Sequence, residues 1–568
     1  MNELYPVYTL KNECHDCYRC VRECYVKAIR INGGSASVLG DKCIACGSCV
    51  RACPSGAKRV RQDIEFVKNM IKDGRRVFVS LAPSWSGIFD YTPQAAALLF
   101  KKLGFEGVSE TALGAQEVSI KTALILKDGR QDLYISGACP AAVDYIRLYK
   151  PKFTRNIVPI ASPALTHAKM LKEHYGDDIS VVFIGPCIAK KNEAKKHPEL
   201  ISAAITFEEL KLWMNEEFID ASHFEDFDCG GFIWQCAYEG ALYPIEGGMN
   251  DTIKQTEIAG DVQYISLSSL PSIEHALKGY KPSGKKIFLE VLACSGGCVN
   301  GPCAGAKKSG ISITSEILSK IKKREKIPQI PQAVVNETYK PSAVEYKLYS
   351  FPEISKAMKK IGKHTEEDEL NCGGCGYPTC KDLASALISG VAEPSMCVSY
   401  MRKIAMRKAD AMLRCMPAAV VIVDDNLNIV EANDAFMRMF CDKDSYKVFT
   451  SRPDGLAGAA IDKIIDFPEI FKQALESGKD IHKEHFHVKN KLYDITAFTI
   501  ENNEIAGAII IDVTQSEMNR EKIAQKARDV ITKNVATVQE IACLLGEHMV
   551  ETELLLNSIA EDYEDDVH

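Results

Sequence analysis

The sequence has no long hydrophobic run and no marked excess of charge of one sign. No stretch of about 18 consecutive apolar residues occurs, so we expect no membrane-spanning helix. The first residues lack the basic and apolar blocks of a signal peptide, so we expect a cytoplasmic protein. The 69 basic and 76 acidic residues give a net charge of −7, which does not favour a nucleic-acid partner or an anionic membrane surface.

The overall composition excludes a disordered or fibrous chain. Hydrophobic residues make up 46% and charged residues 26%, which is ordinary for globular proteins. A length of 568 residues predicts about three to five domains.

Cysteine, in contrast, is abundant. The chain has 22 cysteines and no visible signal peptide, so disulfides are not favoured. In a reducing compartment, clustered cysteines more often bind metal.

Two N-terminal cysteine runs share the spacing C-x2-C-x2-C-x3-C and are separated by a segment, residues 28–40, that predicts a short hairpin. This spacing is typical of a pair of 4Fe-4S clusters, in which the fourth cysteine of each run binds the other cluster. Zinc is the weaker alternative. We assign Cys14, Cys17, Cys20 and Cys53 to set I and Cys24, Cys43, Cys46 and Cys49 to set II.

Residues from about 60 to 345 alternate strand-like and helical patterns, which favours an α/β domain with parallel sheets. Three of the four predicted strands lead directly into a cysteine, and ligands of such sheets bind at the carboxyl ends of strands. The predicted strands are 76–83, 131–140, 179–187 and 286–298, and the predicted helices are 93–104, 162–176 and 207–218. Residues 320–341, rich in Lys and Pro, are interpreted as a linker.

Three segments of this domain, SGACP (136–140), GPCIAKKNE (185–193) and LEVLACSGGCVNG (289–301), resemble the signatures of the FeFe hydrogenases and occur in that family's order. The resemblance covers residues 1 to about 345. It implies an H-cluster, which is a 4Fe-4S cubane joined to a diiron subsite with CO, CN and a bridging dithiolate. The implied cubane ligands are Cys139, Cys187, Cys294 and Cys298, the last also bridging to the diiron subsite.

The resemblance also implies roles around that cofactor. Lys190 would donate to a cyanide ligand, Glu193 would lie behind it, and Pro83 and Ser84 would lie near the second cyanide. The alternative for Cys139 and Cys187 taken singly is an ordinary buried core thiol.

The departures from the family pattern concern proton transfer. Ala138 stands where the family has a proton-relay cysteine, and Lys121 and Thr122 stand where we align its relay glutamates. These changes predict slow turnover. Glu246, Asp251 and Cys303 are weak candidates for another proton route.

A third cysteine group, Cys372, Cys375, Cys380 and Cys397, has the spacing C-x2-C-x4-C-x16-C. It resembles the small 4Fe-4S domain of corrinoid iron-sulfur proteins and sensory hydrogenases, with zinc as the alternative. Residues 403–515 resemble a PAS domain. Within it we interpret His482, His485 and His487 as a solvated strand face, with a heme or other ligand site as the alternative. Residues 515–561 predict a helix suited to dimerisation or partner docking.

These patterns predict a mixed α/β and α+β multidomain protein. The expected domains are a two-cluster ferredoxin module (1–60), an H-cluster domain (61–345), a third 4Fe-4S domain (346–402), a PAS domain (403–515) and a C-terminal signalling helix with an acidic tail (516–568).

The resemblance implies a sensory FeFe hydrogenase of low activity that interconverts H2 with protons and electrons. Its implied partners are a redox protein such as ferredoxin, hydrogenase maturation proteins, a downstream kinase or phosphatase, and a second copy of the chain. The alternatives are a metabolic hydrogenase and an iron-sulfur assembly or electron-transfer protein without a diiron site.

Overall fold

The protein is described from a computed structural model. The described residues are 5–221, 224, 231–234, 238–282, 284–305, 308–321, 332–450, 455–489, 491–514, 528–535 and 537. Contacts divide the chain into two compact units, residues 1–393 and residues 394–568, and each is described by itself.

The first unit begins with the ferredoxin module, in which each cysteine run ends in a short helix. The predicted hairpin is present, and a second two-stranded sheet joins the beginning of the module to its end. The elements are β1 (Val7–Thr9), α1 (Arg19–Glu23), β2 (Ile29–Asn32), β3 (Ser35–Val38), α2 (Ser48–Ala52) and β4 (Lys58–Val60).

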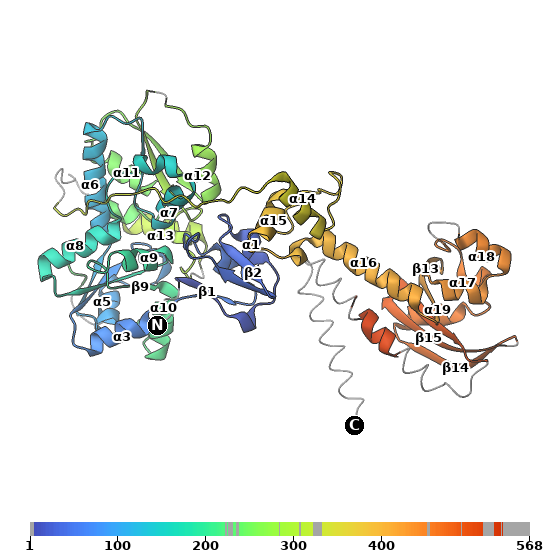
Figure 1. Cartoon of the computed structure of the whole chain (residues 1–568). Coiled ribbons are helices and arrows are strands. Elements are labelled where there is room, and N and C mark those ends of the chain that lie inside the picture. Colours follow the sequence, from blue (N-terminus) through green and yellow to red (C-terminus); the bar gives the residue numbers. More distant parts are fainter. Residues whose placement is uncertain are drawn as a thin grey trace. The chain divides into compact units, whose positions relative to one another are not determined.

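Two parallel sheets form the domain that follows, as the alternating pattern predicts (Figure 1). The four-stranded sheet has the order β6 (Gly107–Glu110), β5 (Val77–Leu81), β8 (Ser180–Gly185) and β9 (Ala203–Thr206). The three-stranded sheet has the order β10 (Gln263–Ser268), β11 (Ile287–Leu292) and β7 (Leu133–Ile135). All four predicted strands are confirmed. Their central residues are buried, because helices cover parallel sheets.

The three predicted helices are confirmed as α5 (Pro93–Lys102), α8 (Pro163–Tyr175) and α10 (Phe207–Glu216). Local signals fix where they start: α5 and α8 have proline in the first turn, and α10 begins with a capping box between Thr206 and Glu209. The other helices of this domain are α3 (Ile64–Lys72), α4 (Trp85–Ile88), α6 (Ala112–Asp128), α7 (Pro140–Tyr149), α9 (Ala189–Lys196), α11 (Gly248–Lys254), α12 (Leu270–Leu277) and α13 (Gly310–Lys320).

The segment interpreted as a linker is not free of the domain where it is described. Residues 332–344 form backbone hydrogen bonds along its surface, from Ala161 to Val335, from Glu337 to Pro159 and from Val344 to Leu148. The prediction of a linker was therefore wrong for this part, because proline disfavours regular helices and strands but does not prevent hydrogen bonds to distant backbone.

The last part of the first unit holds α14 (Phe351–Lys360) and α15 (Cys380–Ile388), packed on each other. Its end is tied to the ferredoxin hairpin, because Ile31 N–H donates to the carbonyl of Val391 and Gly33 N–H donates to Glu393.

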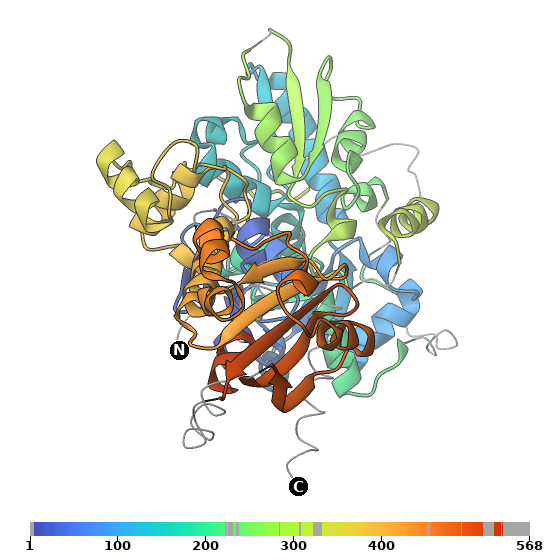
Figure 2. The same cartoon turned by 90° about the vertical axis from the view of Figure 1, so that its right-hand side faces the viewer.

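The second unit has the fold expected of the PAS segment. It is an antiparallel sheet in the order β13 (Ile429–Ala432), β12 (Ala419–Asp424), β16 (Ile505–Asp512), β15 (Lys491–Glu501) and β14 (Ile481–Val488) (Figure 2). The helices are α16 (Val398–Cys415), α17 (Asp434–Phe440), α18 (Lys443–Thr450) and α19 (Glu469–Ser477). The helix predicted over 515–561 lies outside the described residues except for 528–535 and 537, of which 528–535 are helical.

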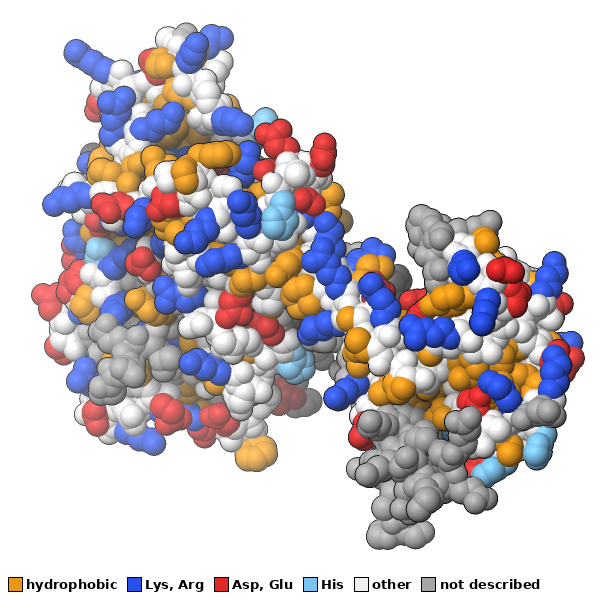
Figure 3. Space-filling model, turned by 45° about the vertical axis from the view of Figure 1, so that its right-hand side comes forward, with side chains coloured by type: hydrophobic (Ala, Val, Ile, Leu, Met, Phe, Trp, Pro, Cys, Tyr) orange, Lys and Arg blue, Asp and Glu red, His pale blue; other side chains and the backbone are white. Residues whose placement is uncertain are grey.

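Acidic and basic side chains are interspersed on the face shown in Figure 3, as the nearly balanced composition leads one to expect. Within the described residues, no helix is both long and apolar enough to cross a membrane.

Candidate active site and cluster positions

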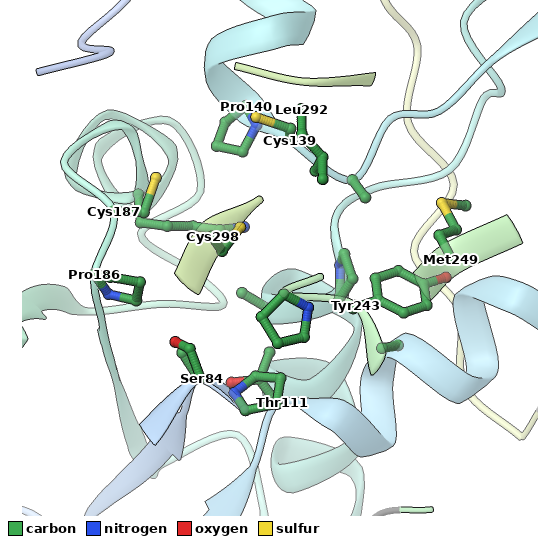
Figure 4. A pocket seen from close by; sticks show the side chains of 18 of the residues that line it. Ser84, Thr111, Cys139, Pro140, Pro186, Cys187, Tyr243, Met249, Leu292 and Cys298 are labelled. Carbon is green, nitrogen blue, oxygen red and sulfur yellow. The ribbon is translucent and has the colours of Figure 1, made fainter. Parts of the chain in front are cut away.

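A cavity lies where the carboxyl ends of strands from both parallel sheets meet. Its volume is about 90 Å³ (Figure 4). Residues that directly follow β5, β6, β7 and β8 line it, together with the last residues of β11, so one backbone topology brings together segments that are far apart in sequence. The lining includes seven of the predicted site residues: Pro83, Ser84, Ala138, Cys139, Cys187, Lys190 and Cys298.

The four cysteines of the H-cluster resemblance are brought together. All four line a second, smaller pocket that adjoins the cavity and shares Cys139, Cys187 and Cys298 with it. Burial, together with the neighbouring thiolate of Cys139, raises the pKa of Cys187 to about 11. Burial also raises the pKa of Cys294 and Cys298, again with thiolates of the same group adding to the rise. Such a group is stable as thiolates only beside positive charge, which iron would provide.

Lys190 supplies a buried cation at this cavity. It is held on α9, where its Nζ donates to Glu193 Oε2 at 2.5 Å and to Ser162 Oγ at 2.7 Å. Glu193 does not line the cavity and pairs with Lys190 from behind, the position expected for it. A lysine Nζ has three donor hydrogens, so the third remains available for an anionic ligand.

Ser84 contributes a polar hydroxyl to the cavity wall, whereas Ala138 contributes an apolar methyl group. The Ser84 Oγ is buried and has no hydrogen-bond partner among the described residues, which suits a hydroxyl awaiting a ligand. Ala138 presents a methyl group, which can neither donate nor accept a proton.

These residues fit the group that the sequence resemblance implies. Four convergent thiols match the ligand count of a cubane, and the orphaned Ser84 hydroxyl and the Lys190 ammonium lie on the side where a diiron subsite with anionic ligands would extend. Among the described residues, no three His, Cys, Asp or Glu side chains are placed to share a single metal ion.

Comparison with protein families supports the same interpretation. Residues 75–302 match the iron-only hydrogenase large subunit, C-terminal domain, and residues 6–54 match a 4Fe-4S dicluster domain. Residues 368–399 match a family described as an Fe-S cluster, and residues 417–515 match a PAS domain. The chain therefore combines an FeFe hydrogenase large-subunit domain with a dicluster ferredoxin domain, an Fe-S domain and a PAS domain.

Two curated relatives are similar over the hydrogenase part. One is iron hydrogenase 1 of Clostridium pasteurianum, 24% identical over 369 residues, which are 51% of this chain and 63% of that protein. The other is the NADP-reducing hydrogenase subunit HndD of Solidesulfovibrio fructosivorans, 25% identical over 377 residues with the same coverage. The chain therefore spans less than two thirds of either relative.

Two solved structures are similar to separate parts of the chain. An FeFe hydrogenase HydA1 variant from Chlamydomonas reinhardtii covers 50% of this chain and 100% of its own, with 16% identity and a TM-score of 0.39. The PAS domain of nitrogen regulation protein NR(II) from Vibrio parahaemolyticus covers 18% of this chain and 96% of its own, with 18% identity and a TM-score of 0.14.

The N-terminal cysteines lie in two groups. Burial, together with the nearby thiolates of Cys17, Cys14 and Cys53, raises the pKa of Cys20 to about 11, so the cysteines of set I lie near one another. Burial raises the pKa of Cys49, and the thiolates of Cys24, Cys43 and Cys46 add to the rise, so set II lies together as well.

Set II adjoins the active site. Cys46 lines the same small pocket as the four H-cluster cysteines. Gly47, with a φ of +79°, lets the set II loop approach the hydrogenase domain, because a Cβ there would lie 2.4 Å from Pro302 Cβ.

Set II also adjoins the third cysteine group. Burial raises the pKa of Tyr377 to about 12, and the thiolates of Cys375 and Cys24 both contribute to the rise. Cys375 and Cys380 are buried and Cys372 is exposed. Cys397 is buried in the second unit, and the Fe-S family match includes all four cysteines.

One cavity residue was missed as a functional candidate although its motif was recognised. Glu290 lies on β11, four residues before Cys294, and lines the active-site cavity. Burial raises its pKa to about 7, in spite of hydrogen bonds from the backbone N–H groups of Gly247 and Asn250. The sequence signal was the glutamate of the third signature, LEVLACSGGCVNG, but only the structure shows that its carboxyl lines the cavity.

The weaker proton-route candidates are not brought to the cavity. Glu246, Asp251 and Cys303 are absent from its lining, which consists of described residues. Of the predicted relay positions, Thr122 is buried and donates to the carbonyl of Val118. The three PAS histidines are exposed on β14, in accord with a solvated strand face.

Proposed function

We propose that this chain is a sensory FeFe hydrogenase that interconverts H2 with protons and electrons slowly and reports its redox state through the PAS domain. The observation that carries the proposal is the methyl group of Ala138 in the wall of a cavity that otherwise holds the expected cysteines and Lys190. Loss of the usual relay thiol with retention of the ligands slows proton transfer, which a sensor tolerates and a high-flux enzyme does not.

The residues of the cavity would hold and orient the cofactor. Cys139, Cys187, Cys294 and Cys298 would bind the cubane, and the sequence resemblance assigns Cys298 to the bridging position. Lys190 would donate a charge-assisted hydrogen bond to an anionic ligand, while Glu193 fixes its orientation. When bound, the H-cluster would supply H2 binding and the exchange of two electrons.

Glu290 would act as the proton acceptor in place of a relay thiol. A general base works best when its pKa lies near the working pH, and burial brings this carboxyl to about 7. Its two backbone donors from the start of α11 hold the carboxyl in place while it gains or loses a proton.

Set II would carry electrons between the active site and the third cluster. Cys46 lines the pocket of the H-cluster cysteines, and Cys24 lies near Cys375. Set II is therefore close both to the H-cluster cysteines and to the third cysteine group. The Fe-S match ends at residue 399 and the PAS match begins at 417, which favours transfer of the redox signal in that direction along the chain.

The partners that would complete the pathway follow from this function. We propose a ferredoxin-like redox partner, maturation proteins that load the diiron subsite, a kinase or phosphatase as the output, and a homodimer. A cytoplasmic location remains a prediction from the sequence.

Restoring the proton relay tests the proposal. Ala138→Cys should raise H2-dependent dye reduction, but by less than about tenfold, which corresponds to 1.4 kcal/mol of barrier. Adding Lys121→Glu and Thr122→Glu should raise it further, because the outer relay positions also lack carboxylates. Ala138→Val, which cannot carry a proton, is the control and should give no gain. A wild type that already turns over as fast as metabolic hydrogenases would contradict the sensory role.

A further inference from the structure

The ferredoxin module is an internal repeat, and its two halves agree closely in backbone conformation. Residues at matching positions of the two runs share a positive φ: Asp16 with Ala45 at 52°, Tyr18 with Gly47 at 56° and 79°, and Lys27 with Gly56 at 52° and 66°. Each half also ends in a short strand that begins just after its fourth cysteine. Differences between matched side chains can therefore be compared directly.

The repeat is broken at one buried position. Ile29 follows Cys24 by five residues and is 1% exposed, as expected for an apolar side chain in a small core. Its counterpart, five residues after Cys53, is Lys58, which is 3% exposed. Burying an ammonium is costly unless negative charge compensates it, so this substitution needs an explanation.

Protein groups compensate Lys58 only in part. Its Nζ donates to Thr9 Oγ1 at 2.6 Å, across the β1–β4 pair in which Thr9 and Lys58 are register partners. No carboxylate among the described residues pairs with it. An ammonium has three donor hydrogens, so one hydroxyl leaves most of its capacity unused.

The positive charge of Lys58 acts electrostatically on cysteines of both sets. Burial raises the pKa of Cys20, from set I, and of Cys43 and Cys49, from set II, while the Lys58 ammonium opposes the rise at all three. One buried cation therefore lies near cysteines of both sets.

We propose that Lys58 is a positioning residue that holds a fixed positive charge between the two clusters of the ferredoxin module and raises the reduction potentials of both together. Reduction adds a negative charge to a cluster, and a nearby buried cation stabilises the more negative state. Because the charge is shared, neither cluster can be retuned alone. The module would hold an electron supplied from the active site instead of returning it.

The consequence differs for the two sets. Set II approaches the active site through Cys46 and the third cysteine group through Cys24. No cysteine of set I lines the pocket of the H-cluster cysteines, although Asp16, between two set I cysteines, lies near Glu393. A raised reduction potential would let the set I cluster hold an electron away from the pocket of the active site. The protein would then stay reduced for longer after it has reacted with H2.

Lys58→Ile, which installs the residue of the sister repeat, tests the inference in the full-length protein. The sample is loaded with 4Fe-4S clusters but not matured, and is titrated electrochemically with EPR detection. At the wild-type midpoint, the ratio of reduced to oxidised ferredoxin clusters should fall at least tenfold, or about 59 mV for a one-electron couple.

Arg59→Gln is the matched control, since it removes the same charge from the next residue, which is exposed and paired with Glu13. It should change the ratio by less than about twofold, because water and salt screen surface charges. Equal shifts in the two variants, or no shift in Lys58→Ile, would overturn the inference.

Lys58→Arg separates charge from shape. It should keep potentials near the wild type, and if Lys58→Ile fails to bind its clusters while Lys58→Arg binds them, the requirement for charge is supported. Failure of both variants to bind clusters would assign Lys58 a packing role and overturn the inference. The inference rests on the two ferredoxin clusters of the proposed function and makes no use of the diiron subsite, so its failure would leave the hydrogenase assignment untouched.

Discussion

Single side chains decide what the active-site cavity can do, and Lys190 is the clearest example. Replacing it with methionine keeps the length but removes a buried cation and leaves Glu193 without its partner. A charge-assisted hydrogen bond is worth about 1.5–3 kcal/mol, so the diiron subsite should load poorly or show shifted CO and CN infrared bands.

The control for Lys190→Met is in the same sample. The EPR signals of the ferredoxin clusters should stay intact, because Lys190 lies in the other domain. Unchanged infrared bands would show that Lys190 does not meet the cofactor.

Glu290 gives a prediction for pH. Burial raises its pKa from 4.5 to about 7, so the fraction of Glu290 in the carboxylate form, which can accept a proton, increases as pH rises through 7. The rate of H2 oxidation should increase across pH 6–8 in the wild type. In Glu290→Gln it should be at least tenfold lower and independent of pH over this range, measured by dye reduction. A variant with the wild-type profile would remove Glu290 from the proton route.

Stability provides an independent check on the same carboxyl. A raised pKa means that the native state holds the proton more tightly than the unfolded chain does. This contribution is fully present below pH 4.5 and is lost as pH rises through about 7. Denaturant titrations should show that loss in wild type and a smaller one in Glu290→Gln.

At the scale of elements, a glycine controls how the ferredoxin module docks. Gly47→Ala would place a Cβ 2.4 Å from Pro302 Cβ and 2.8 Å from Ile188 Cδ1, at a φ of +79°. Overpacking and left-handed strain together should cost about 2–4 kcal/mol and move Cys46 away from the active site. We expect a lower melting temperature and slower reduction of the accessory clusters by H2.

Gly56→Ala is the matched control for that docking contact. Gly56 also has a positive φ, of +66°, but nothing lies within 4 Å of its added Cβ. Gly56→Ala should lose only about 1–2 kcal/mol of stability from backbone strain, and it should keep the wild-type rate of cluster reduction. Equal slowing in both variants would show that the close approach at Gly47 is not what connects the domains.

Sequence patterns anticipated the elements better than the contacts between them. The strands leading to Cys139, Cys187 and Cys294 were predictable because an apolar run that ends in a ligand needs no distant information. The attachment of residues 332–344 to the hydrogenase domain was not, because it depends on backbone pairing with segments that no local pattern specifies. Glu290 and Lys58 were overlooked for a similar reason, since burial of a charged residue is a property of its surroundings.

Across the whole molecule, metal content tests the number of clusters. Sixteen cysteines in four sets would hold four cubanes, and the diiron subsite adds two irons, which gives about 18 irons per chain after maturation. Without maturation factors the chain should contain about 16. Iron near 12 together with zinc would show that Cys372, Cys375, Cys380 and Cys397 bind zinc instead.

The infrared spectrum of the matured, full-length protein tests the central claim most directly. CO and CN ligands absorb where proteins do not, so their bands report a loaded diiron subsite independently of turnover. We predict these bands in the wild type, their loss in Cys298→Ala, and slow H2 turnover in the same wild-type sample. Absence of CO and CN bands after maturation, with all cubanes in place, would contradict the account and leave an electron-transfer protein without a hydrogenase site.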